Sequence, residues 1–129
     1  MQQAITIDAR YKGPPTSGNG GYSCGLMAKE LTGAVEASLK LPPPLGKELQ
    51  ISVDGDSAEM RDGDTLVGTA KSTLLDLEVP ALPGDMKLIG SQVGAPGRPA
   101  KFEPFGTCFV CGHDREHPDG LCIHSEMVE

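Results

Sequence analysis

The sequence predicts one α+β domain in which a single helix packs against an antiparallel sheet. Only the segment after residue 20 has the apolar spacing of an amphipathic helix, whereas five other segments alternate like half-buried strands. These strands are joined mainly by turns, which are too short for the crossovers that parallel strands require. One helix and one antiparallel sheet then bury their apolar faces against each other.

The first strand is expected over residues 5–11, followed by a joint over residues 13–25. Ile5, Ile7, Ala9 and Tyr11 alternate with polar residues, which is the period of a strand with one buried face. In the joint, two prolines extend the backbone and several glycines relax it. The chain therefore passes here from a strand to a helix.

The helix is expected to begin in this joint and to end at Thr32-Gly33. Its narrow apolar stripe consists of residues at i, i+3, i+4 and i+7: Cys24, Met27, Ala28 and Leu31. Ser17 or Asn19 can cap its first N–H groups. Gly20 and Gly21 then occupy the opening turn, where two successive glycines suggest a close approach to the backbone.

Four more strands are expected after the helix. They lie at residues 35–41, 49–53, around 58–60 and from about 65 to 75, and the Asp54-Gly55 and Asp62-Gly63 pairs supply turns between them. Pro42 to Pro44 form a stiff connector. The alternation in the last strand is equally regular on both faces, so it does not decide which face is buried.

The chain divides by composition into a domain at 1–82, a Pro/Gly-rich linker or lid at 83–104, and a Cys/His-containing tail at 105–129. The net charge of −7 argues against nucleic-acid binding, which depends on many Lys and Arg contacts to phosphate. No apolar run is long enough to span a membrane, and no signal peptide precedes the first strand. We therefore expect a cytoplasmic protein, with its four cysteines as thiols or metal ligands.

The joint also carries a family resemblance. The run from Ser17 to Tyr22, following a strand, resembles the start of hot-dog-fold proteins of the acyl-CoA thioesterase type. The resemblance implies a sheet wrapped around the helix and an acyl thioester, such as acyl-CoA, bound at the helix start. In this hypothesis the N–H groups of Gly20 and Gly21 polarise the thioester carbonyl, Asn19 orients substrate or water, and Ser17 and Tyr22 bind substrate.

A purely structural interpretation of the joint is also open. Gly20 and Gly21 would then only let the helix pack tightly onto the sheet, and Asn19 would be an ordinary cap.

The tail allows two interpretations. Cys108 and Cys111 have the C-x2-C spacing of zinc ligands, and Cys122 with His124, or His113 with His117, would complete a tetrahedral site. Alternatively, the Cys108–Gly112 run, with Arg115 and the Asp119-Gly120-Leu121 run, resembles the entry to the second repeat of longer hot-dog proteins. That resemblance implies acyl-CoA-type substrates and no required metal, which leaves the thiols inert or redox-active.

Hydrolysis needs a base, and the joint contains no Asp, Glu or His. Glu30 lies about 15 Å along the helix from Asn19, so Asp56, Glu59 or a residue of a second copy would have to serve. The alternatives are a non-catalytic acyl-CoA-binding module and a zinc-stabilised interaction protein. Because hot-dog sites usually form between two repeats or subunits and sheet edges invite pairing, we expect a homodimer or larger assembly.

Overall fold

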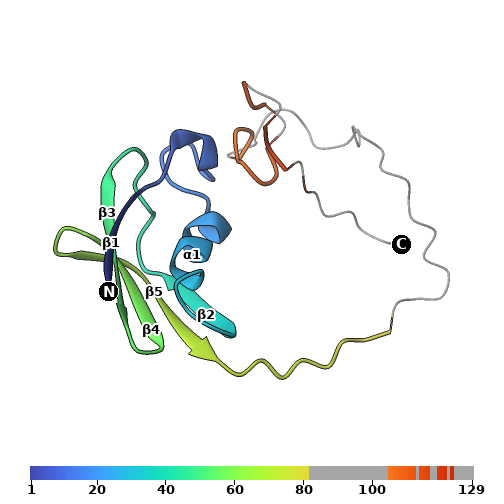
Figure 1. Ribbon diagram of the computed structural model, residues 1–129. Coiled ribbons are helices and arrows are strands. Elements are labelled where there is room, and N and C mark those ends of the chain that lie inside the picture. Colours follow the sequence, from blue (N-terminus) through green and yellow to red (C-terminus); the bar gives the residue numbers. More distant parts are fainter. Residues whose placement is uncertain (82–104, 113, 117–118, 122, 124–129) are drawn as a thin grey trace.

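The computed structural model describes residues 1–81, 105–112, 114–116, 119–121 and 123. Within them the chain forms a short 3₁₀ helix, one α-helix and five strands (Figure 1). In chain order these are β1 Gln2–Thr6, η1 Ala9–Tyr11, α1 Gly20–Ala28, β2 Ala34–Leu39, β3 Glu48–Asp54, β4 Ser57–Asp62 and β5 Thr65–Thr73.

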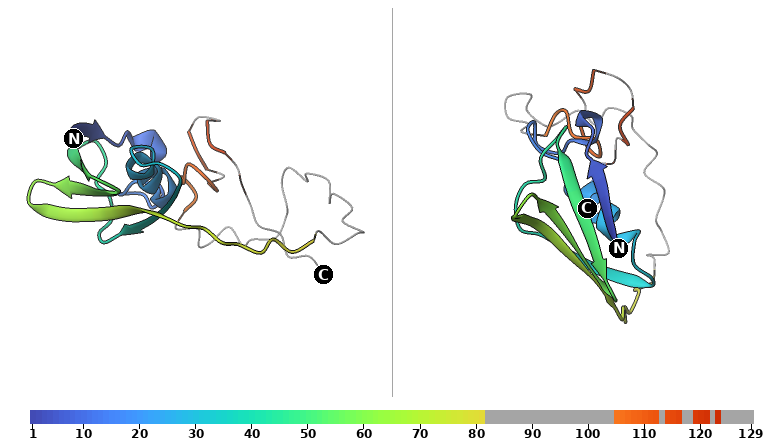
Figure 2. Two further views of the ribbon diagram at one scale, coloured as in Figure 1. Left: turned by 60° about the horizontal axis from the view of Figure 1, so that its bottom comes forward. Right: turned by 60° about the vertical axis from the view of Figure 1, so that its left-hand side comes forward.

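The five strands form one antiparallel sheet in the order β1-β3-β4-β5-β2. The sheet curls around α1, which contacts β2, β4 and β5 (Figures 1 and 2). A strongly twisted antiparallel sheet wrapped around one helix is the hot-dog arrangement. The predicted α+β class and hot-dog fold are therefore confirmed.

The first strand is shorter than its alternation predicts, and the prediction of a strand through Tyr11 was wrong. β1 ends at Thr6, and the Asp8 carboxylate accepts a hydrogen bond of 2.8 Å from the Arg10 N–H. That bond caps η1, so Ala9 to Tyr11 turn as a 3₁₀ helix. A short acidic side chain that captures a nearby N–H offers the backbone an alternative to the sheet, and here it wins.

Helix α1 begins as expected and ends early. Asn19 is its N-cap, because its Oδ1 accepts from the Tyr22 N–H at 3.0 Å, and Gly20 and Gly21 form the first turn. The helix stops at Ala28 rather than near Thr32. The chain then passes through Gly33, whose φ of 78° lies in the left-handed region that favours glycine.

A bulge decides which face of β5 is buried. Met60 pairs with Gly68 but Arg61 pairs with Leu66, so Val67 is an extra residue in β5. Val67 and Gly68 are consequently both buried, as is Ala70. A single unbroken alternation, as the sequence pattern offered, has no place for two neighbouring buried residues.

The core lies between α1 and the concave face of the sheet. Met27 of α1 is fully buried against side chains from β3, β4, β5 and the segment after β1. The largest buried side chains are Ile7, Met27, Leu49, Ile51, Met60 and Val67. These fully buried side chains of the described residues are all aliphatic or sulfur-containing, and Tyr11 and Tyr22 pack against them while only partly buried.

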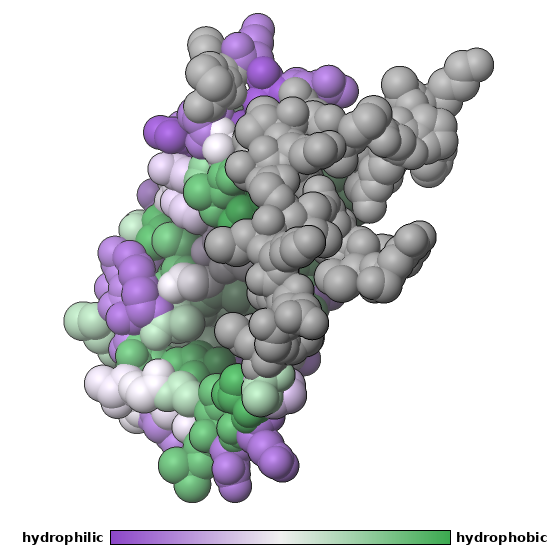
Figure 3. All heavy atoms as spheres, turned by 90° about the vertical axis from the view of Figure 1, so that its right-hand side faces the viewer, coloured by the Kyte–Doolittle hydropathy of each residue, from purple (hydrophilic) through white to green (hydrophobic). Residues whose placement is uncertain are grey.

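After β5 the chain leaves the sheet with its apolar side chains exposed. Leu74 is 97% exposed, and Leu75, Leu77 and Val79 are also mostly exposed. Apolar and hydrophilic side chains mix on the face of the molecule shown in Figure 3.

The predicted linker at 83–104 lies outside the described residues. Among the described residues, no helix is long and apolar enough to cross a membrane.

Candidate functional site

The turn before α1 is fixed by backbone hydrogen bonds and by one required glycine. Asn19 N–H donates to the Tyr11 carbonyl at 2.8 Å, and Gly18 N–H donates to the Pro43 carbonyl at 2.8 Å. A Cβ on Gly18 would lie 2.9 Å from the Ser23 Oγ and 3.2 Å from Ile7 Cγ2. Gly18 is therefore required by packing, and the start of α1 is held rigidly in place.

Gly20 and Gly21 differ from Gly18 in this respect. A Cβ on Gly20 would come no closer than 3.7 Å, to Leu39 Cδ1, and a Cβ on Gly21 no closer than 3.4 Å, to Asn19 Oδ1. These are ordinary contacts, so packing within the described chain does not require either glycine. This finding speaks against the interpretation that they only allow tight packing of the helix onto the sheet.

The first backbone donors of α1 are also available. Neither the Gly20 nor the Gly21 N–H donates to an acceptor within the described part of the chain, because the Asn19 side chain is taken by Tyr22. Gly21 is exposed. Unpaired N–H groups at a helix start carry partial positive charge and suit a carbonyl oxygen or an anion.

Three aromatic rings form a wall beside the helix start. Tyr22 stacks on Tyr11 with ring centroids 4.1 Å apart and planes 7° apart, and Phe109 of the tail meets Tyr11 edge-on at 4.9 Å. Burial raises the pKa of Tyr22, and the charges of Tyr11 and Asp8 add to that shift. Tyr22 is thus a neutral, partly buried ring at neutral pH, which suits a wall against an apolar group.

The tail returns to this place through a tight cysteine-containing turn. Gly112 N–H donates to the Cys108 carbonyl at 2.9 Å, and Phe109 N–H donates to the Lys12 carbonyl at 2.8 Å. A Cβ on Gly112 would collide with the Gly106 carbonyl oxygen and would lie 2.6 Å from Cys108 N. Only glycine fits there, so the turn is closed and docked on the segment before α1.

Cys108 touches the helix cap. Its sulfur accepts from Asn19 Nδ2 at 3.5 Å, and the residue is 3% exposed. Burial raises the pKa of the Cys108 thiol, but hydrogen bonds from the backbone of Cys111 and Val110, and from the side chains of Cys111 and Asn19, outweigh it. The pKa of Cys108 is therefore lower than that of an ordinary thiol, whereas burial raises the pKa of Cys24 in α1.

The zinc prediction is tested only for part of its ligand set. Among the described residues, no group of three or more His, Cys, Asp or Glu side chains is placed to hold a metal ion. Cys122 and His124, and the alternative pair His113 and His117, lie outside the described residues. Cys108 and Cys111 contact each other. Because the other ligands of the predicted set are not described, zinc binding stays a prediction.

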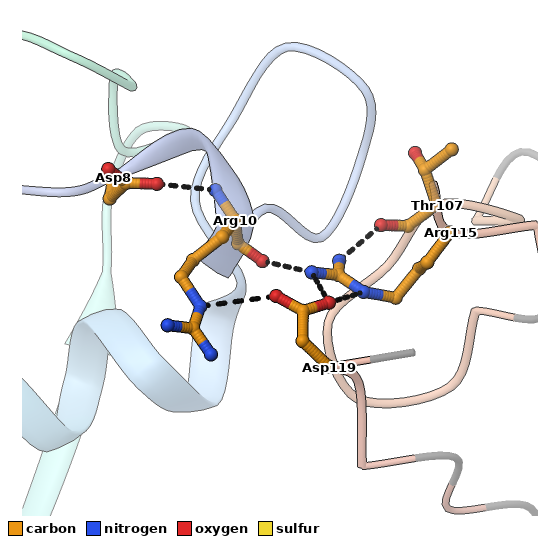
Figure 4. A network of polar contacts seen from close by, with 5 residues as sticks. All are labelled: Asp8, Arg10, Thr107, Arg115 and Asp119. Carbon is orange, nitrogen blue, oxygen red and sulfur yellow. Dashed lines mark hydrogen bonds and ion pairs between the residues drawn. The ribbon is translucent and has the colours of Figure 1, made fainter. Parts of the chain in front are cut away.

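Sequence reasoning missed the polar network that fastens the tail to η1 (Figure 4). Arg115, whose side chain is 9% exposed, donates to the carbonyls of Thr107 at 2.9 Å and Arg10 at 2.8 Å, and to Asp119 Oδ1 through Nε at 2.9 Å and Nη2 at 2.7 Å. Asp119 also pairs with Arg10 at 3.2 Å. The hydrogen bond from Arg115 lowers the pKa of Asp119. The only signal for this network in the sequence was the spacing of Arg115 and Asp119.

An open cavity of about 430 Å³ lies beside this network, between η1 and the tail. Positive and negative side chains share its wall, and Asn19, Gly20 and Gly21 do not line it. Its lining residues are Ala9, Arg10, Lys12, Thr107, Asp114, Arg115, Glu116 and Asp119.

The remaining predicted site residues lie in other places. Ser17 is 5% exposed within the turn, which leaves little of it for a substrate to touch. Asp56 lies in the β3–β4 turn, where Ser57 Oγ donates to it. Glu59 pairs with Arg61 at 2.9 Å and alternates with the buried Ala58 and Met60, so it lies on the outer face of the sheet. Glu59 therefore faces away from the helix, and Asp56 is held in a turn between two strands.

Comparison with protein-family models finds no match for this chain, and comparison with curated proteins also finds none. Among solved structures, the chain is similar to one described as "Crystal structure of protein RHA08564, thioesterase superfamily protein". The two share 22% sequence identity with a TM-score of 0.47, over 54% of this chain and 48% of that chain. The chain thus spans about half the length of that protein.

Proposed function

We propose that the chain binds an acyl thioester, such as acyl-CoA, with the thioester carbonyl at the start of α1. The observation that carries this proposal is the pair Gly20 and Gly21, whose N–H groups meet no acceptor among the described residues and whose packing there does not require glycine. A carbonyl oxygen that approaches two backbone N–H groups needs them bare and unshielded by a Cβ. Both conditions are met here.

In this proposal the neighbouring residues have separate roles. The side chain of Asn19 accepts the hydrogen bond of the Tyr22 N–H and therefore does not occupy the N–H groups of Gly20 and Gly21. Those two N–H groups are left to bind the ligand. Tyr22 offers its ring as an apolar wall near the acyl group. Ser17 supports the turn from behind, since it is buried.

Hydrolysis would need a base in addition. Among the described residues, no carboxylate or imidazole hydrogen-bonds Asn19, Gly20 or Gly21. We propose that a second copy supplies the base in a homodimer, because β1 and β2 are the edges of the sheet and edge strands invite pairing. A thioester-binding module without turnover is the alternative, and it needs only the helix start. We keep the cytoplasm as the proposed location.

Gly21→Ala tests the proposal directly. The added methyl group has room in the free protein, so we expect unfolding stability to stay equal or to rise by up to about 1 kcal/mol, as for other Gly-to-Ala changes in helices. The methyl would stand where the carbonyl approaches, so acyl-CoA affinity should fall at least about tenfold, or about 1.4 kcal/mol. Calorimetric titration of the full chain with acyl-CoA measures the affinity.

Gly25→Ala is the matched control, because Gly25 lies in the same helix and its added Cβ would meet nothing within 4 Å. It should leave acyl-CoA affinity unchanged. Equal affinity in wild type and Gly21→Ala, or no acyl-CoA binding by the wild type, would overturn the proposal.

The homodimer is tested separately by light scattering over a range of concentrations. A mass that stays at one chain, 13.5 kDa, at high concentration would contradict the dimer and would favour the binding module over the hydrolase. Release of free thiol from acyl-CoA by the dimer distinguishes hydrolysis from binding.

A further inference from the structure

We propose that Cys108 and Cys111 form a reversible disulfide couple that exchanges with low-molecular-weight disulfides of the glutathione type. The proposal concerns the tail turn itself and does not depend on thioester binding. It rests on the contact between the two thiols, on their unequal exposure and on the closed geometry of the turn.

The two sulfurs are already together. The Gly112 N–H donates to the Cys108 carbonyl at 2.9 Å, which closes the turn, and the side chain of Cys111 interacts with that of Cys108 inside it. No disulfide joins the two cysteines in this structure. Forming a disulfide requires the two cysteines to be close and suitably oriented, and a thiolate surrounded by N–H donors is ready to attack a neighbouring sulfur.

Exposure gives the two thiols different tasks. Cys111 is partly exposed, so an external disulfide can reach it, whereas Cys108 is only 3% exposed and is shielded by Asn19 and the turn. An external reagent therefore meets Cys111 first. Cys108 then resolves the intermediate from inside the turn.

The chemistry balances as two exchange steps. The Cys111 thiolate attacks one sulfur of the external disulfide, forming a mixed disulfide and releasing one thiolate, which takes a proton from water. The Cys108 thiolate then attacks the Cys111 sulfur, forms the Cys108–Cys111 bond and releases the second external sulfur as a thiolate, which also takes a proton from water. The protein pair loses two electrons, and the external disulfide gains them.

Gly112 closes the turn that makes this step favourable. Its amide binds the Cys108 carbonyl, and no side chain fits at the position. Holding two thiols in one short turn raises the effective concentration of one near the other. The closed turn is thus the feature that separates this pair from unrelated thiols such as Cys24.

The test uses the full chain in buffers with graded ratios of reduced to oxidised glutathione, followed by thiol labelling, digestion and mass spectrometry. We expect Cys108 and Cys111 to lose label together, in one peptide lighter by about 2 Da, while Cys24 remains labelled. Cys24→Ser should leave this behaviour unchanged, and Cys111→Ser should abolish the linked peptide.

Gly112→Ala examines the role of the turn. It should lower the equilibrium constant for the internal disulfide by about tenfold or more, because the pair is no longer held together. Circular dichroism checks that the sheet and helix remain. Gly25→Ala should show no change.

Three results would overturn the proposal. The first is that the labelling of Cys108 and of Cys111 equals that of Cys24 in all buffers. The second is that one of the two pairs with Cys24 or Cys122 instead of with the other. The third is one tightly bound metal ion per chain in the purified protein that Cys111→Ser removes, since the two thiolates would then be metal ligands.

Discussion

Asn19 is the residue at which the turn, the helix and the tail meet. Its backbone N–H is bound to Tyr11, its side-chain oxygen caps Tyr22, and its side-chain nitrogen donates to the Cys108 sulfur. Oxygen and nitrogen of one amide thus serve two different segments. Serine and threonine have donor and acceptor on a single hydroxyl oxygen and aspartate has no donor, so among the common capping residues only asparagine offers them on two separate atoms.

Substitutions at Asn19 separate these two tasks. Asn19→Ala loses the cap and should destabilise the protein by about 1 kcal/mol in urea unfolding. Asn19→Asp keeps an acceptor for Tyr22 and should stay close to wild-type stability. Both variants remove the donor to Cys108, so the pKa of Cys108 should rise in both, and more so beside the negative charge of Asp.

The pH dependence of Cys108 alkylation, followed by mass spectrometry, measures that pKa, with Cys24 as the internal reference. An unchanged Cys108 profile in both variants would show that the Asn19 contact does not act on the thiol.

At the scale of elements, Gly68 of β5 lies where α1 and β2 leave little room for a side chain. A Cβ on Gly68 would lie 3.0 Å from Met27 Cε and 3.1 Å from the carbonyl oxygen of Ser38 in β2. The side chain of Met27 is flexible, but the backbone of β2 is not. Gly68 therefore sets how closely the helix and the edge strand pack on β5.

Gly68→Ala should destabilise the domain by about 1–3 kcal/mol, the usual cost of overpacking a core. Urea unfolding measures the change. Gly25→Ala, with open space around its Cβ, controls for the effect of the same substitution on the unfolded chain. Equal stability of the two variants would mean that the sheet can shift to make room for the methyl group.

The elements that the sequence predicted well are those bounded by clear turn residues. β3 and β4 end at Asp54-Gly55 and Asp62-Gly63, and Gly55 and Gly63 take φ values of 57° and 56°. The hydrophobic alternation of the sequence did not predict where β1 ends or which face of β5 is buried. A side-chain cap at Asp8 and a bulge at Val67 decided them, and neither changes the hydrophobic alternation.

At the scale of the whole molecule, the tail is fastened to η1 by a nearly buried arginine. Arg115 uses its guanidinium to bind two carbonyls and Asp119, and the fork of an arginine is suited to such multiple contacts (Figure 4). Loss of the Asp119 charge would leave this cation without its carboxylate partner. The docking of the tail should therefore depend on pH.

The direction of that dependence follows from the lowered pKa of Asp119. The docked tail favours the ionised carboxylate, so its contribution is fully present above the ordinary aspartate pKa of about 3.9. It is lost as the pH falls below that value through the lowered pKa. The chain has no tryptophan and only two tyrosines, Tyr11 and Tyr22, so near-ultraviolet circular dichroism reports on the rings under Phe109.

Acid titration should weaken this signal in the wild type. Asp119→Asn, which cannot ionise, should show a weaker signal already at neutral pH and no further change through this range. A wild-type curve that matches the variant would contradict the role of Asp119 in docking.

The sequence predicted the local part of the candidate site but not its contact with the tail. The cap and the two glycines follow from local spacing, because Asn19 and Gly21 are near one another along the chain. The contact between Asn19 and Cys108 spans 89 residues, and no periodicity predicts it. The role of the tail cysteines stays a prediction, and the place of the tail against the start of α1 could come only from the structure.

The segment from Arg10 to Lys12 is shared by the tail and by the start of the helix. Carbonyls of Arg10 and Lys12 accept from Arg115 and Phe109, while the carbonyl of Tyr11 between them accepts from Asn19. Undocking the tail must therefore relax the same short stretch of backbone that anchors α1. Because thermodynamic linkage is reciprocal, the factor by which the tail alters affinity at the helix start is also the factor by which a bound molecule alters tail docking.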